Sequence, residues 1–266
     1  MTPSMISFTT DYGLSDGFVA ACHGAIARLA PQARVLDVTH LIPPGDVRRA
    51  AAVLAQTVPS LPQSVHLAVV DPGVGTSRRP IALRTADGSL LVGPDNGLLL
   101  PAADALGGPT VAVHLTNRTW FADRVSHTFH GRDIFAPVAA RLWSGADLRE
   151  AGADIDDPVR LPAPLVSRSE GTLTAEVLTI DHFGNVQLAA TADLLADTPR
   201  ELQVNGEPAT RTTTFAEAPE GTLVVLADSA GHVAVAVNGG NAATRLAAAP
   251  GTPITLTWPS PTPHRT

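Results

Sequence analysis

A carboxylate and a guanidinium flank one tight loop in the N-terminal half of the chain. Asp71 ends a short apolar run, and Arg78 follows it after a turn that contains Pro72, Gly73 and Gly75. Proline removes a backbone donor and glycine admits positive φ, so the chain turns sharply and a ligand can approach its backbone. Ligands bind beyond the carboxyl ends of strands in open α/β sheets, which makes this loop the first candidate for chemistry. The alternative is that Asp-Pro-Gly simply forms a stable turn.

A second aspartate follows the first predicted strand in the same way. Residues 6–9 read as a strand and lead into Asp11, whose short acceptor side chain suits a sugar diol or an ammonium group. Asp16 lies just before a predicted helix. It either caps that helix by accepting hydrogen bonds from the first amides or binds a ligand, and the sequence leaves both roles open.

One histidine stands where a helix can set its protonation state. His130 precedes a helix predicted over residues 133–143, and the free amides and positive dipole at a helix N-terminus favour neutral imidazole over imidazolium. Nothing polar recurs near four other histidines, which we therefore predict to be structural. These are His23, His40, His66 and His114.

The elements that must position these residues alternate through the first 165 residues. Apolar runs at residues 6–9, 35–38 and 65–70 predict strands, and the segments 18–29 and 46–57 between them predict helices. This β-α-β-α-β order predicts a mostly parallel sheet with right-handed crossovers and helices on its faces. The further predicted elements are a hairpin over residues 81–92, a strand over 111–115 and the helix over 133–143.

The pattern changes near residue 165, where we place a domain boundary between residues 1–165 and 166–266. A Leu-Pro-Ala-Pro segment at residues 161–164 indicates a linker. Short alternating segments in the second domain predict a smaller all-β, barrel-like fold. The predicted strands cover residues 172–180, 201–204, 222–226, 232–237 and 254–258. Two polar loops, 181–185 and 238–241, either carry function or merely connect hairpins.

Composition excludes several classes of protein. The 266-residue chain has a formal net charge of −7 and scattered basic residues, which argues against a nucleic-acid partner. The single cysteine, Cys22, excludes an intrachain disulfide and a cysteine-based metal site, and it reads as a small core residue. The chain has no signal-peptide pattern and no apolar run of the roughly 20 residues that a membrane span needs. These features predict a cytoplasmic protein with no membrane partner.

Six short motifs, taken together and in order, resemble those of the S-adenosyl-L-methionine (SAM) hydroxide adenosyltransferases, which are adenosine-forming SAM hydrolases related to the fluorinase and chlorinase. The resemblance spans about residues 6–258, and six motifs in register are specific although each one alone is weak. The motifs are TDYG at residues 10–13, VDPGVGT at 70–76 with Arg78, PDNG at 94–97, TFHGRD at 128–133, DHFGN at 181–185 and NGGNA at 238–242.

The resemblance implies an α/β N-terminal domain and a barrel-like C-terminal domain, assembled as a homotrimer with active sites between subunits. It implies attack of water or hydroxide on the ribose C5′ of SAM, which expels methionine and leaves adenosine. SAM is therefore the implied substrate. Because its sulfonium is already a good leaving group, we expect neither a cofactor nor a metal. The water-activating set of the family corresponds to Asp71, Arg78 and His130. Arg78 can favour hydroxide character, while Asp71 and His130 can orient the water and accept its proton.

The resemblance also assigns substrate contacts. It implies that Asp11 holds the ribose hydroxyls, that Asp16 and Asp181 lie near the methionine amino group, and that Ser229 lies at the methionine carboxylate. An arginine follows that serine in the fluorinase, whereas Ala230 follows it here. The remaining implied contacts are stacking of adenine on Phe183 and Phe215, the adenine-edge contact of Asn185, and the motif residues Asp95, Asn96, Thr128, Phe129 and Asn238.

Two departures argue against halide chemistry. The halogenating relatives carry a tyrosine where this chain has Asp71, and a carboxylate there would repel an incoming halide. The long loop that the fluorinase inserts is replaced here by four residues, 86–89. The alternatives to a hydrolase are a chlorinase-like halogenase, with which Gly131 is shared, and a non-catalytic sensor of SAM or a nucleoside. A sensor would not need the water-activating set.

Overall fold

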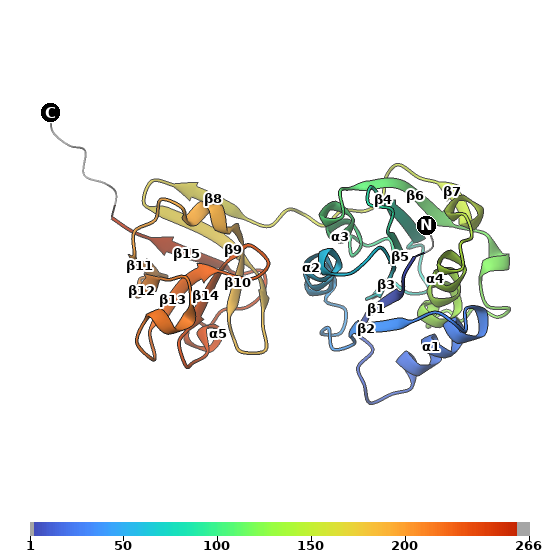
Figure 1. The fold of residues 1–266 in the computed structure, drawn as a ribbon, viewed down its shortest axis with the longest axis horizontal. Helices are drawn as coiled ribbons and strands as arrows, with labels where there is room; N and C mark the ends of the chain where they lie inside the picture. The colour runs from blue at the N-terminus through green and yellow to red at the C-terminus, as the bar shows by residue number, and fades with distance from the viewer. Residues whose placement is uncertain (1–2, 260–266) are drawn as a thin grey trace. The chain divides into compact units, whose positions relative to one another are not determined.

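The structure, a computed structural model, describes residues 3–259 and divides into two compact units between Leu161 and Pro162 (Figure 1). The division falls within the predicted linker segment 161–164, four residues before the boundary that we placed at 165. The first unit is α/β and the second is a β-barrel. None of the helices within residues 3–259 combines the length and the apolar character that crossing a bilayer requires.

The first unit contains a seven-stranded sheet in the order β2-β1-β3-β5-β4-β6-β7. The pairs β1–β2, β1–β3 and β3–β5 are parallel, whereas β4 and β7 run antiparallel to their neighbours. The mostly parallel sheet and the β4–β5 hairpin are therefore confirmed. The strands are β1 (Ile6–Thr10), β2 (Val35–Thr39), β3 (Val65–Val69), β4 (Pro80–Thr85), β5 (Leu90–Pro94), β6 (Pro109–Leu115) and β7 (Gly152–Asp154).

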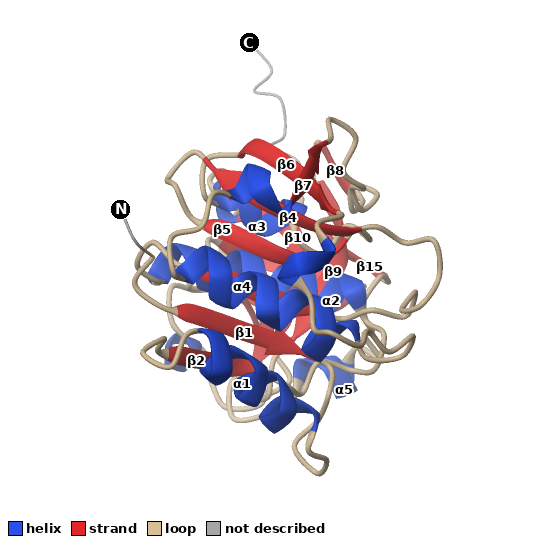
Figure 2. Cartoon of the chain, turned by 90° about the vertical axis from the view of Figure 1, so that its right-hand side faces the viewer, coloured by secondary structure: helices blue, strands red, loops and turns tan. Residues whose placement is uncertain are grey.

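Helices cover both faces of this sheet. On one face, α1 and α4 lie over β1 and β3, and Figure 2 shows both in front of the sheet. On the other face lie α2 and α3, whose core includes Ala68 and Val70 from the end of β3. Successive side chains of a strand point to opposite faces, so a strand buried on both faces is mostly apolar, as β3 is apart from His66, whose Nδ1 lies 2.8 Å from Ser7 Oγ. The helices are α1 (Phe18–Leu29), α2 (Val47–Thr57), α3 (Leu100–Ala105) and α4 (Ala136–Trp143).

The N-terminal caps of α1 and α2 show whether Asp16 acts as a helix cap. Asp46, the first residue of the predicted helix 46–57, caps α2, because its carboxylate accepts a hydrogen bond from the Arg49 amide at 2.9 Å. Gly17 occupies the N-cap position of α1, and no side chain caps that helix. The capping role considered for Asp16 is therefore wrong, and this exposed residue lies in the loop between β1 and α1.

The strand order creates a switch point at the carboxyl ends of β1 and β3. The chain passes from β1 through α1 to β2 on one side, and then through α2 to β3 on the other side of β1. Thr10 pairs with Val69 in the parallel register, so Asp11 and Asp71 emerge from adjacent strands at the same edge. Such a switch point is where open α/β sheets bind ligands.

The second unit closes into a barrel of seven strands. The order is β10-β14-β13-β12-β11-β15-β9, and pairing of β9 with β10 completes the ring while β8 extends from β9. In β9, buried residues alternate with half-buried ones, as expected for a strand with one face in the core. The all-β prediction is confirmed. The strands are β8 (Val166–Ser169), β9 (Thr172–Ile180), β10 (Val186–Thr191), β11 (Glu201–Val204), β12 (Glu207–Arg211), β13 (Leu223–Ala227), β14 (His232–Val237) and β15 (Pro253–Thr257), and one helical turn, α5 (Ala242–Arg245), follows β14.

Candidate active site

Asp71 and Arg78 form a bidentate ion pair across the loop that follows β3. Arg78 Nε donates to Asp71 Oδ1 at 3.0 Å, and Arg78 Nη2 donates to Asp71 Oδ2 at 2.5 Å. The two side chains are only 8% and 6% exposed. Two successive turns shape the loop, because the Val74 amide bonds the Asp71 carbonyl and the Thr76 amide bonds the Gly73 carbonyl. The turn chemistry of this segment therefore brings a cation back onto the carboxylate that precedes it.

His130 contacts the same guanidinium nitrogen of Arg78 that donates to Asp71 Oδ2. Its Nδ1 is 3.0 Å from Arg78 Nη2, so Arg78 bridges Asp71 and His130. Arginine only donates, so Nδ1 must be the acceptor and the ring proton must be on Nε2. Burial, followed by the charge of Arg78, lowers the pKa of His130, which also favours the neutral ring. The three residues of the predicted water-activating set are thus in direct contact.

The carboxylate of this set is more basic than an ordinary aspartate. Burial raises the pKa of Asp71, while the charge and hydrogen bonds of Arg78 oppose that shift. Bidentate pairing uses one lone pair on each oxygen and leaves others for a further donor. Asp71 can therefore accept a proton, whereas the Nδ1 of His130 is already occupied by Arg78.

One polar atom of the set has no partner in the part of the chain that is described. Arg78 Nη1 is buried and donates to no protein acceptor there. An unsatisfied donor on a buried cation is costly, and native proteins rarely leave such a group unpaired. The atom belongs to the guanidinium that contacts both Asp71 and His130 through Nη2, and it can donate to an oxygen atom of a bound molecule.

A close backbone approach holds the Arg78 loop against the His130 loop. Gly75 has φ of +78°, and a Cβ built on it would lie 2.3 Å from the carbonyl oxygen of His127. Only glycine fits, both because of the conformation and because of the space. Asp133 fixes the second loop, since its buried carboxylate accepts a hydrogen bond from the Ser126 amide at 2.8 Å. Asp133 ends the TFHGRD motif, but no local pattern indicates its contact with a residue seven positions earlier.

A π-helical turn, Gly131–Phe135, follows His130 and leads directly into α4. The predicted helix over 133–143 is therefore present but begins two residues earlier and in a wider form. Such turns occur often at functional sites. The absence of a side chain at Gly131 makes room for Tyr12, whose hydroxyl lies 2.0 Å from the position of a Cβ on Gly131. Burial raises the pKa of Tyr12, which keeps the phenol protonated.

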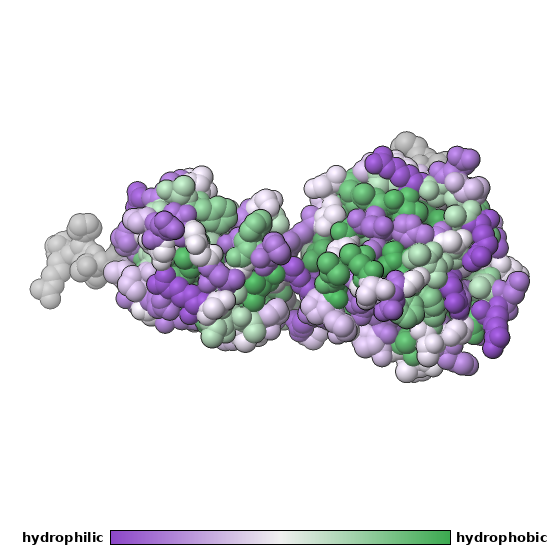
Figure 3. All heavy atoms as spheres, turned by 90° about the horizontal axis from the view of Figure 1, so that it is seen from below, coloured by the Kyte–Doolittle hydropathy of each residue, from purple (hydrophilic) through white to green (hydrophobic). Residues whose placement is uncertain are grey.

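Aromatic rings line the same corner of the unit. Phe129 makes edge contacts with Tyr12 at 5.7 Å and with Phe18 at 5.3 Å between ring centroids. Phe18 and Leu14 stay 47% and 68% exposed although they are large and apolar. Figure 3 shows one face of the molecule on which hydrophobic residues gather over the α/β unit. The sequence indicated Phe129 but gave no reason to select Tyr12 or Phe18, because their contacts join loops far apart in the chain.

The other predicted residues of this unit lie around the switch point. Asp11 accepts a hydrogen bond from the Gly45 amide at 2.8 Å. Asn96 Nδ2 donates to the carbonyl of Val70, the residue before Asp71, at 2.9 Å. Asp95 is buried, and its oxygens accept from Arg79 Nε and from the Val159 amide, both at 2.8 Å. Through these bonds Asp95 and Asn96 support the two ends of the loop that contains Asp71. Thr128 is exposed beside Phe129.

The predicted residues of the barrel lie in its loops. Asp181 organises the β9–β10 turn, because Oδ1 accepts from the amides of Phe183 and Asn185 at 2.9 Å and Oδ2 accepts from Asn185 Nδ2 at 2.7 Å. Phe183 and Phe215 are 73% and 46% exposed. Ser229 is exposed in the β13–β14 loop. Asn238 follows β14 and donates to the Ala218 carbonyl at 2.8 Å.

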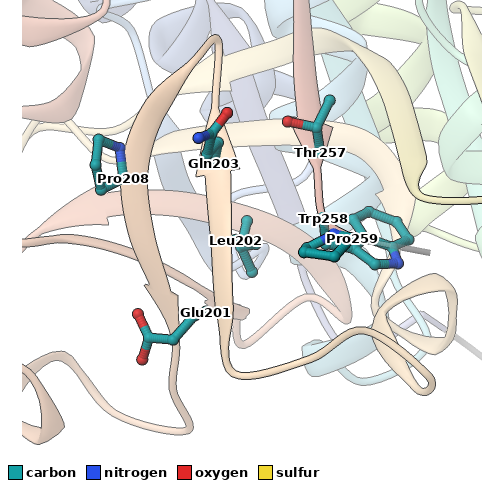
Figure 4. Close-up of a pocket in the computed structure, with 7 residues that line it drawn as sticks. All are labelled: Glu201, Leu202, Gln203, Pro208, Thr257, Trp258 and Pro259. Atoms are coloured by element: carbon teal, nitrogen blue, oxygen red, sulfur yellow. The ribbon is translucent and has the colours of Figure 1, made fainter. Parts of the chain in front are cut away.

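Each unit also contains a separate hollow. The α/β unit has a cleft of about 610 Å³ next to the ion pair, and Arg78 and His130 both line it. Arg79, Arg118 and His127 add further basic groups to its wall. The barrel has a hollow of about 460 Å³ at β11 and β15, which includes Glu201, Leu202 and Trp258 (Figure 4). None of the predicted site residues lines this second hollow, so we do not assign it to the site.

Comparison with known proteins gives consistent matches to both units. Residues 6–152 match the family model described as SAM hydroxide adenosyltransferase N-terminal domain, and residues 175–255 match the model of the C-terminal domain. A Salinispora arenicola protein named (R)-S-adenosyl-L-methionine hydrolase is 66% identical over 95% of this chain and 97% of its own length. A Thermus thermophilus protein of the same name is 40% identical over 94% of this chain and 98% of its own length.

More distant matches include a fluorinase and a solved structure. An Actinoplanes fluorinase is 29% identical over 68% of this chain and 70% of its own length. The crystal structure of an uncharacterized conserved protein from Thermotoga maritima superposes with a TM-score of 0.89 at 35% identity, covering 96% of this chain and all of that one. The fluorinase is thus much less similar to this chain than the two hydrolases are.

Proposed function

The chain belongs to the SAM hydroxide adenosyltransferase family, and from this premise we propose that it is an enzyme that hydrolyses SAM to adenosine and L-methionine. The relatives named for hydrolysis of the (R) form are 66% and 40% identical to it, whereas the fluorinase is 29% identical. We extend the same stereochemical preference to this chain. The observation that carries the mechanism is the contact of Arg78 with both Asp71 and His130, with Nη1 left without an acceptor among residues 3–259.

In this mechanism Arg78 Nη1 donates to the oxygen of the attacking water. The guanidinium favours negative charge on that oxygen, and Asp71 accepts the proton because its pKa is raised and the hydrogen bonds from Arg78 and the Gly73 amide leave it a lone pair. His130 does not act as the base, since its Nδ1 accepts from Arg78. Its Nε2–H is a donor that orients the water or the substrate. Holding the nucleophile in this way removes much of the entropy cost of the reaction.

The bond changes balance without a further reactant. The water oxygen forms a bond to the ribose C5′, the C5′–S bond breaks, and its electron pair returns to sulfur to give the neutral thioether of methionine. The water proton passes to Asp71 and then to solvent. A sulfonium leaves without protonation or electrophilic assistance, so the mechanism needs neither a metal ion at the reacting atoms nor an organic cofactor.

We propose the substrate contacts from family position and from exposure. Asp11 holds the ribose hydroxyls at the switch point, and Asp16 lies near the methionine amino group. Phe183 and Phe215 are exposed aromatic rings that can stack on adenine, as bases commonly do in proteins. The further assigned contacts are Asp181 at the methionine amino group, Asn185 at the adenine edge and Ser229 at the methionine carboxylate.

We also propose that the protein is a cytoplasmic homotrimer in which the barrel of one subunit completes the site of its neighbour. Mixing two impaired variants after reversible dissociation tests this assembly: His130→Ala, which lowers kcat, and Phe183→Ala, which raises KM, assayed at a SAM concentration below the wild-type KM. Shared sites predict partial recovery of activity, because some sites then combine an intact loop with an intact barrel. Recovery that never exceeds the activity of the two variants separately would contradict it.

Product analysis tests the proposed reaction and separates it from its alternatives. The protein is incubated with SAM, with and without chloride, and the nucleosides are separated by chromatography. We expect adenosine and methionine in equal amounts at a rate that is independent of chloride. Accumulation of 5′-chloro-5′-deoxyadenosine would instead identify a halogenase, and stoichiometric binding of SAM without turnover would identify a sensor.

A further inference from the structure

Two of the histidines that we predicted to be structural converge on one carboxylate outside the proposed active site. His23 Nε2, on α1, is 2.9 Å from Asp37 Oδ1, on β2. His40 Nε2, in the residue after β2, is 3.1 Å from the same oxygen. All three ligand atoms lie within 4.8 Å of one another. The sequence pattern did not indicate this cluster, because α1 and β2 meet only after the sheet has formed.

The surrounding side chains hold both imidazoles in place. Phe8 pairs with Asp37 in the parallel register, and its ring contacts His40 at 4.9 Å and His23 at 5.9 Å between centroids. Thr10 Oγ1 lies 2.8 Å from His40 Nδ1, so the ring nitrogen opposite Nε2 has its own hydrogen-bond partner. Metal-binding histidines almost always have such a partner on the second nitrogen, which fixes their tautomer and orientation.

Hydrogen bonding within the cluster does not satisfy the Nε2 atom of His40. Its side chain is 3% exposed, and within the described residues its Nε2 makes no hydrogen bond of acceptable geometry despite the nearby carboxylate. A buried imidazole nitrogen without a hydrogen bond is costly. His23 and Asp37 are 34% and 43% exposed, so solvent reaches the cluster from their side. A buried ligand atom, His40 Nε2, thus faces two ligand atoms on side chains that solvent reaches.

We propose that His23, Asp37 and His40 bind one divalent transition-metal ion, and that Zn²⁺ is the ion that fits best. Two imidazole nitrogens and one carboxylate oxygen are a common ligand set for zinc, with water in the open position. Ligands at about 2.0–2.1 Å from zinc lie roughly 3.3 Å apart at tetrahedral angles, close to the observed 2.9 and 3.1 Å. Mg²⁺ and Ca²⁺ prefer oxygen ligands and fit this set poorly.

The ion would act on the structure of the switch point and not on the reacting atoms. It would join α1 to the end of β2 and to the loop that follows. The carbonyl of His40 accepts from the Gly13 amide at 2.8 Å, and Gly45 in the same loop donates to Asp11. Binding would therefore fix the two loops around Asp11. This inference does not depend on the proposed hydrolysis, which is metal-free at the reacting atoms.

Calorimetric titration of chelator-treated, full-length protein with Zn²⁺ tests the proposal. We expect one ion per chain, a rise in melting temperature on binding, and an affinity at least about 100-fold lower in His23→Ala and in Asp37→Asn. Both replaced side chains are partly exposed, so the variants should fold, and circular dichroism checks this. The control is His182→Ala, which removes an exposed histidine from the barrel and should retain the affinity.

Absence of zinc binding to the wild-type chain would overturn the proposal. Equal affinity of the wild-type chain and both variants would also overturn it, because zinc would then bind elsewhere. Substitution with Co²⁺ gives a second readout, since its visible absorption reports nitrogen and oxygen ligands directly. The absorption should appear in the wild-type chain and the His182→Ala control and should be lost in Asp37→Asn. Its survival in Asp37→Asn would contradict the assigned ligands.

Discussion

The loops of the α/β unit and the loops of the barrel differ in how far their proposed functional residues are buried. The α/β loops carry the residues assigned to water activation, and the barrel loops carry the rings assigned to adenine binding. Asp71 and Arg78 are almost fully buried, bonded to each other and joined to His130. Phe183 and Phe215 project 73% and 46% of their surface into solvent. The first set is complete within one unit, whereas the second consists of exposed side chains on turns that are themselves well organised, such as the one built by Asp181.

This difference in burial predicts that water activation and nucleoside recognition depend on different contributions to the free energy. The groups that handle water are ordered by folding, so no reorganisation is needed when the substrate arrives. The groups that recognise the nucleoside bury their apolar surface only on binding, and that burial contributes to affinity. Substitutions in the buried set should therefore alter kcat, and substitutions in the exposed set should alter KM.

The largest effect is expected from Asp71→Asn, which keeps the shape of the side chain but removes the proton acceptor. We expect kcat to fall by about 10²- to 10⁴-fold, with KM changed little. His130→Ala should give a loss in the same range, and the double variant should be far from additive because both residues act on one water molecule. Steady-state kinetics with SAM measures both constants. A near wild-type kcat with a sharply raised KM would move these residues into the binding group.

The next largest effect is expected from Gly75→Ala, which touches no catalytic group directly. Its Cβ would lie 2.3 Å from the His127 carbonyl, so the Arg78 and His130 loops must separate. Because small displacements of reacting groups are costly, we expect kcat to fall on the order of 10²-fold. Gly206→Ala is the matched control, since Gly206 also has positive φ, at +85°, but has nothing within 4 Å of its Cβ. Similar activity of the two variants would show that the contact between the loops is unimportant.

Local rules placed Asp71 and Arg78 at the edge of the sheet, whereas the resemblance to the family supplied the roles of Asp71, Arg78 and His130. A buried strand before Asp71, a Pro-Gly turn and a basic residue beyond it define the edge of a sheet whatever lies around it. The same rules predicted β1 to β3, α1 and α2. They missed α3, a six-residue helix with Pro101 in its first turn, because so short a segment shows no clear periodicity.

The rest required contacts between distant segments. The barrel strands β8, β10 and β12 were missed, and the closure by β9 and β10 depends on pairings that no turn sequence specifies. The approach of Gly75 to His127 and the anchoring of Ser126 by Asp133 likewise arise only when loops meet. The cluster of His23, Asp37 and His40 is the clearest example of such a contact between distant segments, because no pattern around any one of the three residues indicates it.

A smaller effect, on KM alone, is expected from Phe183→Ala. Loss of one stacking ring should raise KM by about tenfold or more, while kcat stays near the wild-type value. Stability should change little because the ring is 73% exposed. Thermal unfolding alongside the kinetics distinguishes lost recognition from lost folding. A large fall in kcat would mean that the exposed set also positions the reacting atoms and would remove the contrast between the two regions.

The smallest effect is expected from a modest change of pH. Asp71 must be ionised to accept a proton, and its pKa is raised, so kcat should fall as the pH decreases through that value. The loss approaches tenfold for each pH unit below the pKa. Protonation of His130 would also lower activity in acid, so the profile is measured again in His130→Ala. The acid limb should persist in this variant, and its disappearance would identify His130 as the proton acceptor.

The central claim is that a water molecule held by Arg78 attacks the ribose carbon of SAM. Reaction in water enriched with oxygen-18, followed by mass spectrometry of the nucleoside, tests this claim most directly. The mechanism predicts one heavy oxygen in each adenosine, located at the 5′-hydroxyl, and unlabelled methionine. Adenosine without the label, or label recovered in methionine, would show that water does not attack C5′ and would contradict the mechanism.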